Sequence, residues 1–181
     1  SLSTALQLHG IASVYLSDRE SLLASQEAED CLHWLRACAN PGNEALVKAA
    51  LGTLTLDLPL SQLLAWQDDE LEWEQQTQFF YQLQQSWQRQ GVLVMLQLLL
   101  QHFQLPARLL AKSGGERSLT NLLHLAEWLQ QASVNIDGEQ ALIRHLAQQL
   151  GSNDEQSLLR LESDAQRIKI LTIHKSKGLE Y

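Results

Sequence analysis

The spacing of hydrophobic residues along most of the chain is that of amphipathic helices. Apolar side chains recur every three or four positions, which places them on one face of a helix with 3.6 residues per turn. The clearest stripe is that of residues 25–39, formed by Ala28, Cys31, Leu32, Leu35 and Cys38. The same spacing predicts further helices over residues 44–51, from about 59 to 66, from about 69 to 90, and over 92–103, 109–111, 119–132 and 139–150. Ser118 or Thr120 is expected to cap the helix over 119–132.

Strand-like patterns occur only near the two ends of the chain. Residues 11–16 form a short β-branched and aromatic run, and residues 168–174 alternate as a half-buried strand does. About a hundred residues of helical pattern separate these two segments. We therefore expect a mainly α chain, in which a helical block is inserted into an incomplete α/β domain.

The net charge of −8 is unevenly distributed over the 181 residues. Residues 167–181 carry four basic side chains (Arg167, Lys169, Lys175 and Lys177) against Glu180 alone. The other 166 residues carry 9 basic and 20 acidic side chains, a balance of −11. A protein that grips nucleic acid over its whole surface should be basic throughout. We therefore expect this chain alone to bind DNA weakly or not at all.

The cysteines, histidines and tryptophans predict no metal site and no base-stacking surface. Cys31 and Cys38 lie about 10 Å apart along one helix, too far for a disulfide, so two buried thiols in the cytoplasm are expected. The histidines have no metal-ligand spacing. The five tryptophans lie on apolar stripes and are expected in the core. No signal peptide and no membrane span of about 20 apolar residues is evident.

The richest chemistry lies in the last ten residues. A strand that ends in Thr172, His174, Ser176, Lys177 and Gly178 offers hydroxyl, imidazole and ammonium groups, and a glycine where a phosphate can approach the backbone. The carboxylate of Glu180 could accept hydrogen bonds from a sugar hydroxyl. From the residues alone, a solvated basic loop remains the alternative.

Residues 170–181, Ile-Leu-Thr-Ile-His-Lys-Ser-Lys-Gly-Leu-Glu-Tyr, resemble motif V of the UvrD/Rep-type superfamily 1 DNA helicases. The start of the chain resembles the stretch after motif IV in those enzymes. The residues that carry this second likeness are Gly10, Ile11, Val14, Tyr15, Arg19, Gln26, Glu27, Asp30, Leu35, Arg36, Asn40 and Pro41. Residues 114–122 and 159–164 resemble the RecB branch, the beta subunits of exodeoxyribonuclease V.

The resemblance implies a division of the chain into three parts. Residues 1–55 would be the N-terminal piece of the RecA-like lobe called 2A, and residues 56–163 the helical 2B subdomain. Residues 164–181 would return into 2A with motif V. The parent protein would be an ATP-dependent helicase and nuclease that repairs double-strand breaks together with RecC- and RecD-type subunits and uses ATP and Mg.

The resemblance also implies roles for single residues. Glu180 would contact the nucleotide, and Thr172 and His174 would lie at the single-stranded DNA backbone. Ser176, Lys177 and Gly178 would shape that DNA-binding loop. Arg19, Glu27 and Asp30 match motif positions and are expected to order the lobe rather than to touch a ligand.

Several elements of such an enzyme are absent from the sequence. There is no Gly-x-x-x-x-Gly-Lys-Ser/Thr phosphate loop and no complete catalytic set, so we expect a piece of a longer polypeptide that is inactive alone and binds no cofactor. Residues 51–58 replace the Arg-Gly-Ile-Gly turn of many relatives, a turn that resembles a duplex-binding hairpin. Packing against partner subunits is therefore the expected role of the helical block. The alternatives are another UvrD-like or AddA-type helicase, or a non-enzymatic helical interaction module.

Overall fold

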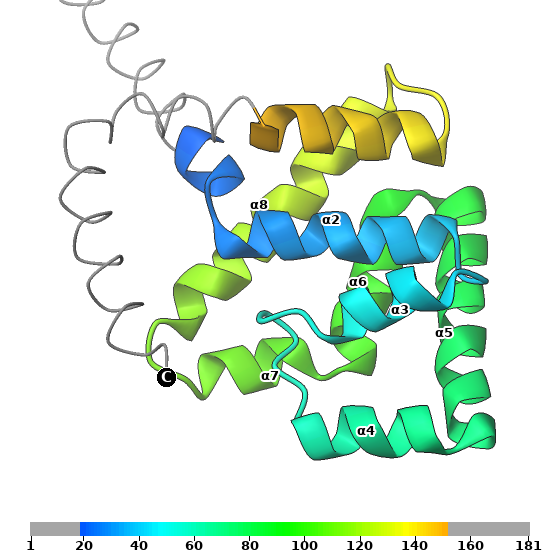
Figure 1. Ribbon diagram of the computed structural model, residues 1–181. Helices are drawn as coiled ribbons and strands as arrows, with labels where there is room; N and C mark the ends of the chain where they lie inside the picture. The colour runs from blue at the N-terminus through cyan, green and yellow to red at the C-terminus, as the bar shows by residue number, and fades with distance from the viewer. Residues whose placement is uncertain (1–18, 152–181) are drawn as a thin grey trace, which may run out of the picture.

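The computed structural model describes residues 19–151, and these residues form helices joined by short connections (Figure 1). Residues 19–23 and 139–151 are helical at the two ends of this range. The helices between them are α2 (Gln26–Ala39), α3 (Glu44–Leu51), α4 (Leu60–Asp68), α5 (Glu70–Gln90), α6 (Val92–His102), α7 (Leu105–Leu110) and α8 (Gly115–Ser133). The prediction of a mainly α chain is confirmed. The two predicted strands, at 11–16 and 168–174, lie outside the described residues.

The helices are layered around α6. This helix packs against α5, α7 and α8, while α2 lies across α8 and also contacts α3 and α5 (Figure 1). Five residues of α6 are buried: Val92, Met95, Leu96, Leu99 and Leu100. The sequence of residues 92–103 is apolar on nearly all sides, which predicts a helix in the centre of the core. This prediction is confirmed for the buried face, but Leu98 on the opposite face is 41% exposed.

The helix ends show why several boundaries could be predicted. The Ser25 hydroxyl accepts a hydrogen bond from the Ala28 N–H at 3.2 Å, and Asn43 Oδ1 accepts one from the Leu46 N–H at 3.3 Å. Asp69 caps α5 by accepting from the Leu71 N–H at 2.9 Å. Each cap satisfies a backbone donor that the first turn of a helix leaves unpaired.

The start of α6 has no capping side chain of its own and is capped from another helix. Gln130 of α8 places Oε1 at 3.1 Å from the N–H of Leu93. The preceding residue, Gly91, has φ of 97° and separates α5 from α6. A Cβ atom on Gly91 would lie 2.9 Å from Gln130 Oε1, so the absent side chain leaves room for this cap.

The start of α8 differs from the sequence prediction. The helix was expected from residue 119 with Ser118 or Thr120 as its cap, but it begins at Gly115 after Gly114, which has φ of 77°. Gly115 lies directly against the preceding helix, because a Cβ atom there would come within 1.6 Å of the Leu109 carbonyl oxygen. The missing side chain lets α8 begin a turn earlier than its apolar stripe does.

A single hydrophobic core joins α2 and α3 to the helices that follow them. Gln84 of α5 donates from Nε2 to the Ala39 carbonyl oxygen at 3.0 Å, and Cys38 Sγ lies 3.6 Å from Met95 Sδ. The core therefore extends across residue 55. The boundaries at 1–55, 56–163 and 164–181 remain a prediction.

The expected burial of the two cysteines and the expected packing of the tryptophans in the core are confirmed. Cys31 and Cys38 are free and buried, and burial raises the pKa of both thiols. Trp34 and Trp87 are buried, and Trp66, Trp73 and Trp128 are partly buried against the core. No helix between residues 19 and 151 has the length and apolar character needed to cross a membrane.

Gly115 provides a direct test of this packing. Gly115→Ala should lower the free energy of unfolding by about 3 kcal/mol, because the new methyl group must displace the backbone of Leu109. Gly114→Ala serves as the matched control, since the new Cβ atom would have no other atom within 4 Å. This substitution should cost only the strain of a left-handed backbone at an alanine, about 1–2 kcal/mol. Urea unfolding of both variants measures the difference. Equal losses would contradict the close approach of α8 to Leu109.

Candidate functional site

The residues singled out from the sequence fall into two groups. The motif V residues lie outside the described part of the chain; they are Thr172, His174, Ser176, Lys177, Gly178 and Glu180. The structure describes the other three, Arg19, Glu27 and Asp30. These three lie on or just before α2, and each of them contacts a different element of the fold.

Asp30 is a buried carboxylate that holds the connection between α3 and α4. Its side chain is 3% exposed. Asp30 Oδ2 accepts hydrogen bonds from the backbone N–H of Thr55 at 2.8 Å and from the Thr55 hydroxyl at 2.5 Å. Its Oδ1 accepts from Nε2 of Gln26, one turn earlier, at 2.9 Å. Hydrogen bonds to an ionised acceptor are stronger than those between neutral groups, and here they satisfy both oxygens.

A second polar contact from α2 reaches the same connection. Trp34 Nε1 donates to the Thr53 hydroxyl at 3.0 Å, and that hydroxyl donates to the Ala50 carbonyl oxygen at 2.9 Å. From the other side, Arg108 Nη1 donates to the Leu56 carbonyl oxygen at 2.8 Å. Residues 53–56 are therefore fixed from both α2 and α7.

This connection lies within residues 51–58, the stretch that the resemblance sets against an Arg-Gly-Ile-Gly turn. Thr53, Thr55 and Leu56 are buried, whereas Leu54 points outward with 73% of its side chain exposed. Asp57 has φ of 48° and pairs with Lys112, which lowers the pKa of the Asp57 carboxyl. Residues 53–57 carry no cationic side chain of their own, and the two cations that reach them, Arg108 and Lys112, are bound to the Leu56 carbonyl oxygen and to Asp57. The connection therefore has no unpaired cation to offer a phosphate backbone.

Glu27 and Arg19 contact α8. Glu27 is 8% exposed, and its Oε1 accepts a hydrogen bond from Nδ2 of Asn121 at 3.4 Å. The guanidinium carbon of Arg19 lies 5.6 Å from the centre of the Trp128 ring, within the range of a cation–π interaction. Trp128 in turn stacks on His145 with a centroid distance of 5.3 Å.

The side chains at all three motif positions thus make packing or hydrogen-bond contacts within the fold. Within residues 19–151, no group of three or more His, Cys, Asp or Glu residues is placed to hold a metal ion. His102, stacked on Phe79 at a centroid distance of 3.7 Å, has its pKa lowered by burial. We find no nucleophile with an adjacent base among the contacts that these residues make.

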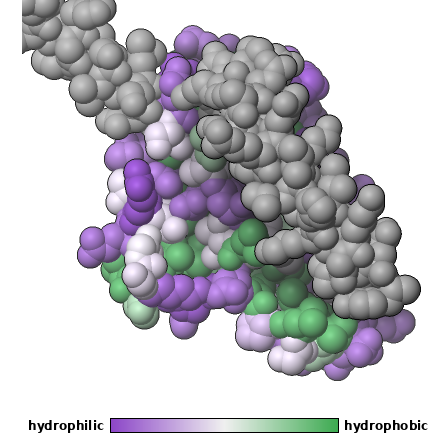
Figure 2. All heavy atoms as spheres, turned by 60° about the vertical axis from the view of Figure 1, so that its left-hand side comes forward, coloured by the Kyte–Doolittle hydropathy of each residue, from purple (hydrophilic) through white to green (hydrophobic). Residues whose placement is uncertain are grey.

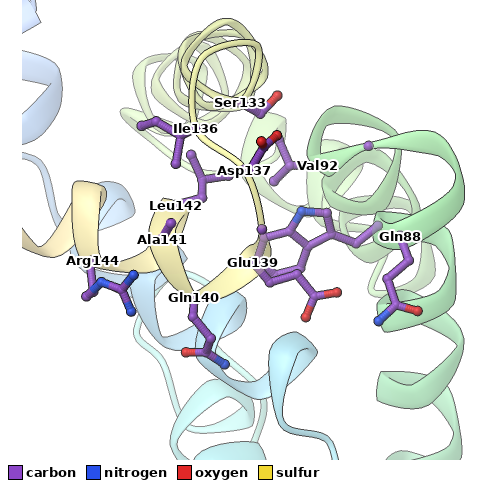
Figure 3. A pocket seen from close by; sticks show the side chains of 13 residues that line it. Gln88, Val92, Ser133, Ile136, Asp137, Glu139, Gln140, Ala141, Leu142 and Arg144 are labelled. Carbon is purple, nitrogen blue, oxygen red and sulfur yellow. The ribbon is translucent and has the colours of Figure 1, made fainter.

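A cleft that the sequence pattern does not reveal lies at the junction of α5, α6, α8 and the last described helix (Figure 3). Its volume is about 630 Å³, and its polar lining includes Gln88, Asp137, Glu139 and Arg144. Burial raises the pKa of Glu139, whose Oε1 has no hydrogen-bond partner. From the sequence, Glu139 was predicted only as the first residue of a helix. Its place in the cleft could not be predicted, because α5, which forms the opposite wall of the cleft, lies some fifty positions away in the chain.

Comparison with known proteins gives one consistent result. The chain is 43% identical to RecBCD enzyme subunit RecB of Haemophilus influenzae over 177 residues and 40% identical to that of Escherichia coli over 180 residues. RecB of Mycobacterium tuberculosis is 30% identical over 190 residues. No family model matches the chain.

The alignments cover nearly all of this chain but a small part of each relative. They include 97% of the chain against the Haemophilus protein and 98% against the Escherichia protein. The chain spans only 14% and 15% of the length of those two relatives. The resemblance to the RecB branch is confirmed. The chain matches one segment of the RecB subunits and belongs to the RecB family.

Proposed function

We propose that this chain is part of the helicase and nuclease subunit of a RecBCD-type enzyme, which unwinds and degrades DNA with ATP in double-strand break repair. The observation that carries the proposal is the 40–43% identity to RecB subunits over at least 97% of the chain. An alignment of that extent leaves out only about five residues of this chain, so it extends over Arg19, Glu27 and Asp30 and as far as Thr172 and His174. The two free, buried cysteines support a reducing, cytoplasmic location.

Motif V supplies the contacts to the ligands in this proposal. Glu180 hydrogen-bonds the ribose of ATP, and Thr172 and His174 meet the single-stranded DNA backbone. Ser176, Lys177 and Gly178 shape the loop between these two contacts. The rest of the parent supplies the phosphate loop and the Mg ligands, since neither is present here.

Arg19, Glu27 and Asp30 act as ordering residues. Their contacts support this role, because Asp30 fixes residues 53–56 while Glu27 and Arg19 reach α8. A rigid connection of this kind would transmit movements of the motif V lobe into the helical block.

The helical block has a protein-binding role in this proposal. It packs against RecC- and RecD-type subunits rather than gripping duplex DNA. The support for this choice is the buried connection at 53–56 and the acidic balance of the chain outside its last fifteen residues.

Substituting Glu180 in the full-length parent tests the nucleotide contact. Glu180→Ala removes a charge-assisted hydrogen bond of about 1.5–3 kcal/mol, so ATP affinity should fall about tenfold to a hundredfold. Single-stranded DNA affinity should change much less. Glu29→Ala, an exposed carboxylate on α2, is the control. Unchanged ATP affinity and turnover in Glu180→Ala would refute the assignment.

The isolated 181-residue chain should be inactive. Without a phosphate loop or Mg ligands, it should hydrolyse no ATP in the presence of single-stranded DNA. Labelled DNA should not saturate at micromolar protein and physiological salt, because the −11 body repels phosphates and about three cationic contacts are too few. ATP turnover that survives repurification, or tight and salt-sensitive duplex binding, would contradict the proposal.

A further inference from the structure

Helix α4 differs from the other helices between α2 and α8, because none of its residues is buried. Leu60 and Leu64 lie one turn apart on the same face and are 70% and 48% exposed. Leu71, in the first turn of α5, is 68% exposed. At the lower end of the molecule, where α4 lies in Figure 1, the surface shows apolar and hydrophilic residues side by side (Figure 2).

The exposed leucines border a groove, here called the α4 groove. It is lined by Leu60, Leu63 and Leu64 of α4, Leu51 of α3 and Trp73 of α5, and its volume is about 210 Å³. Small-molecule sites usually measure about 300–1,000 Å³, so this groove suits one or two apolar side chains rather than a whole ligand. Helices bind such grooves through anchors spaced three or four residues apart.

The charge beside the α4 groove selects among possible occupants. Five exposed acidic residues, here called the acidic turn, lie between the last residue of α4 and the second turn of α5: Asp68, Asp69, Glu70, Glu72 and Glu74. The salt bridges found between residues 19 and 151 involve Glu44 and Asp57, so the acidic turn is not neutralised within this range. The one cation at the groove, Lys48, is held by Glu44 at 2.8 Å and lies 5.7 Å from the centre of the Trp73 ring.

We propose that the α4 groove docks a helix of a partner subunit that carries an apolar stripe flanked by lysine or arginine. The apolar stripe would cover Leu60 and Leu64, and the basic flank would pair with the acidic turn. A second copy of this chain would bring a second acidic turn against the first, and DNA or an anionic membrane would likewise be repelled. That the helix belongs to a partner subunit rests on the proposed function. That it carries an apolar stripe and a basic flank rests only on the groove and on the acidic turn.

A synthetic peptide tests the chemistry on the 181-residue chain. The probe is a labelled 16-residue helix with leucines at i, i+3, i+4 and i+7 and lysines on both flanks, and its counterpart has glutamates in place of the lysines. Fluorescence anisotropy should show binding of the lysine peptide at roughly micromolar concentration and at least about tenfold weaker binding of the glutamate peptide.

Two matched variants locate the binding surface. Leu64→Ser should weaken binding of the lysine peptide about tenfold, since it removes a groove wall. Val134→Ser removes an apolar side chain that is 76% exposed and lies outside the groove, so it should leave the affinity unchanged. No binding, or equal effects of the two substitutions, would overturn the proposal. A dimer in sedimentation that Leu64→Ser dissolves would also overturn it, in favour of a second copy.

The full-length parent tests the source of the helix. Leu64→Glu should reduce co-purification of the partner subunits while the parent retains its ATP hydrolysis on single-stranded DNA. If the partner subunits co-purify fully with the Leu64→Glu parent, the α4 groove does not bind a helix of a partner subunit. A wild-type parent without ATP hydrolysis would contradict the proposed function instead, and the peptide titration would still decide what the groove binds.

Discussion

The buried carboxylate of Asp30 is the interaction on which the arrangement of the helices depends. It lies on α2 and binds both the N–H and the hydroxyl of Thr55, which is 25 residues further along the chain. A carboxylate removed from water is costly unless hydrogen bonds satisfy it, and Asp30 has three. The burial of this charge therefore requires the chain after α3 to return to α2.

That return sets the positions of the elements that follow. With residues 53–56 fixed between α2 and Arg108 of α7, α4 leaves the body of the molecule and leads into α5. The core is then closed by α6 and α8, and Gln130 of α8 caps the start of α6. The exposure of α4 and the α4 groove follow from this path, because α4 contacts α5 while Leu60 and Leu64 face outward.

The sequence predicted those features that depend on neighbours along the chain. The bounds of α2, α3 and α5 followed from three-four spacing, and the structure adds that Ser25, Asn43 and Asp69 cap these helices. The start of α8 was missed because Gly115 is explained only by the Leu109 backbone against which it packs. The one-sided burial of α6 was missed because an apolar composition does not show which face lacks a neighbour.

For the candidate site, the sequence predicted which residues matter but not which residues they contact. Motif resemblance selected Arg19, Glu27 and Asp30, but their partners could not be derived, since Trp128, Asn121 and Thr55 lie 25 or more positions away. Periodicity carries no information about pairs at that separation. The cleft beside Glu139 and the α4 groove were missed for the same reason, because each is formed by helices that meet only in the folded chain.

The most direct measurement of the central claim is a double-mutant cycle between Asp30→Ala and Thr55→Val, followed by urea unfolding. The hydroxyl–carboxylate hydrogen bond should give a coupling free energy of about 1–2 kcal/mol, because each single substitution already breaks the bond. Losses that add to within about 0.3–0.5 kcal/mol would show that the two residues are independent. That result would contradict the role of Asp30 in holding the α3–α4 connection to α2.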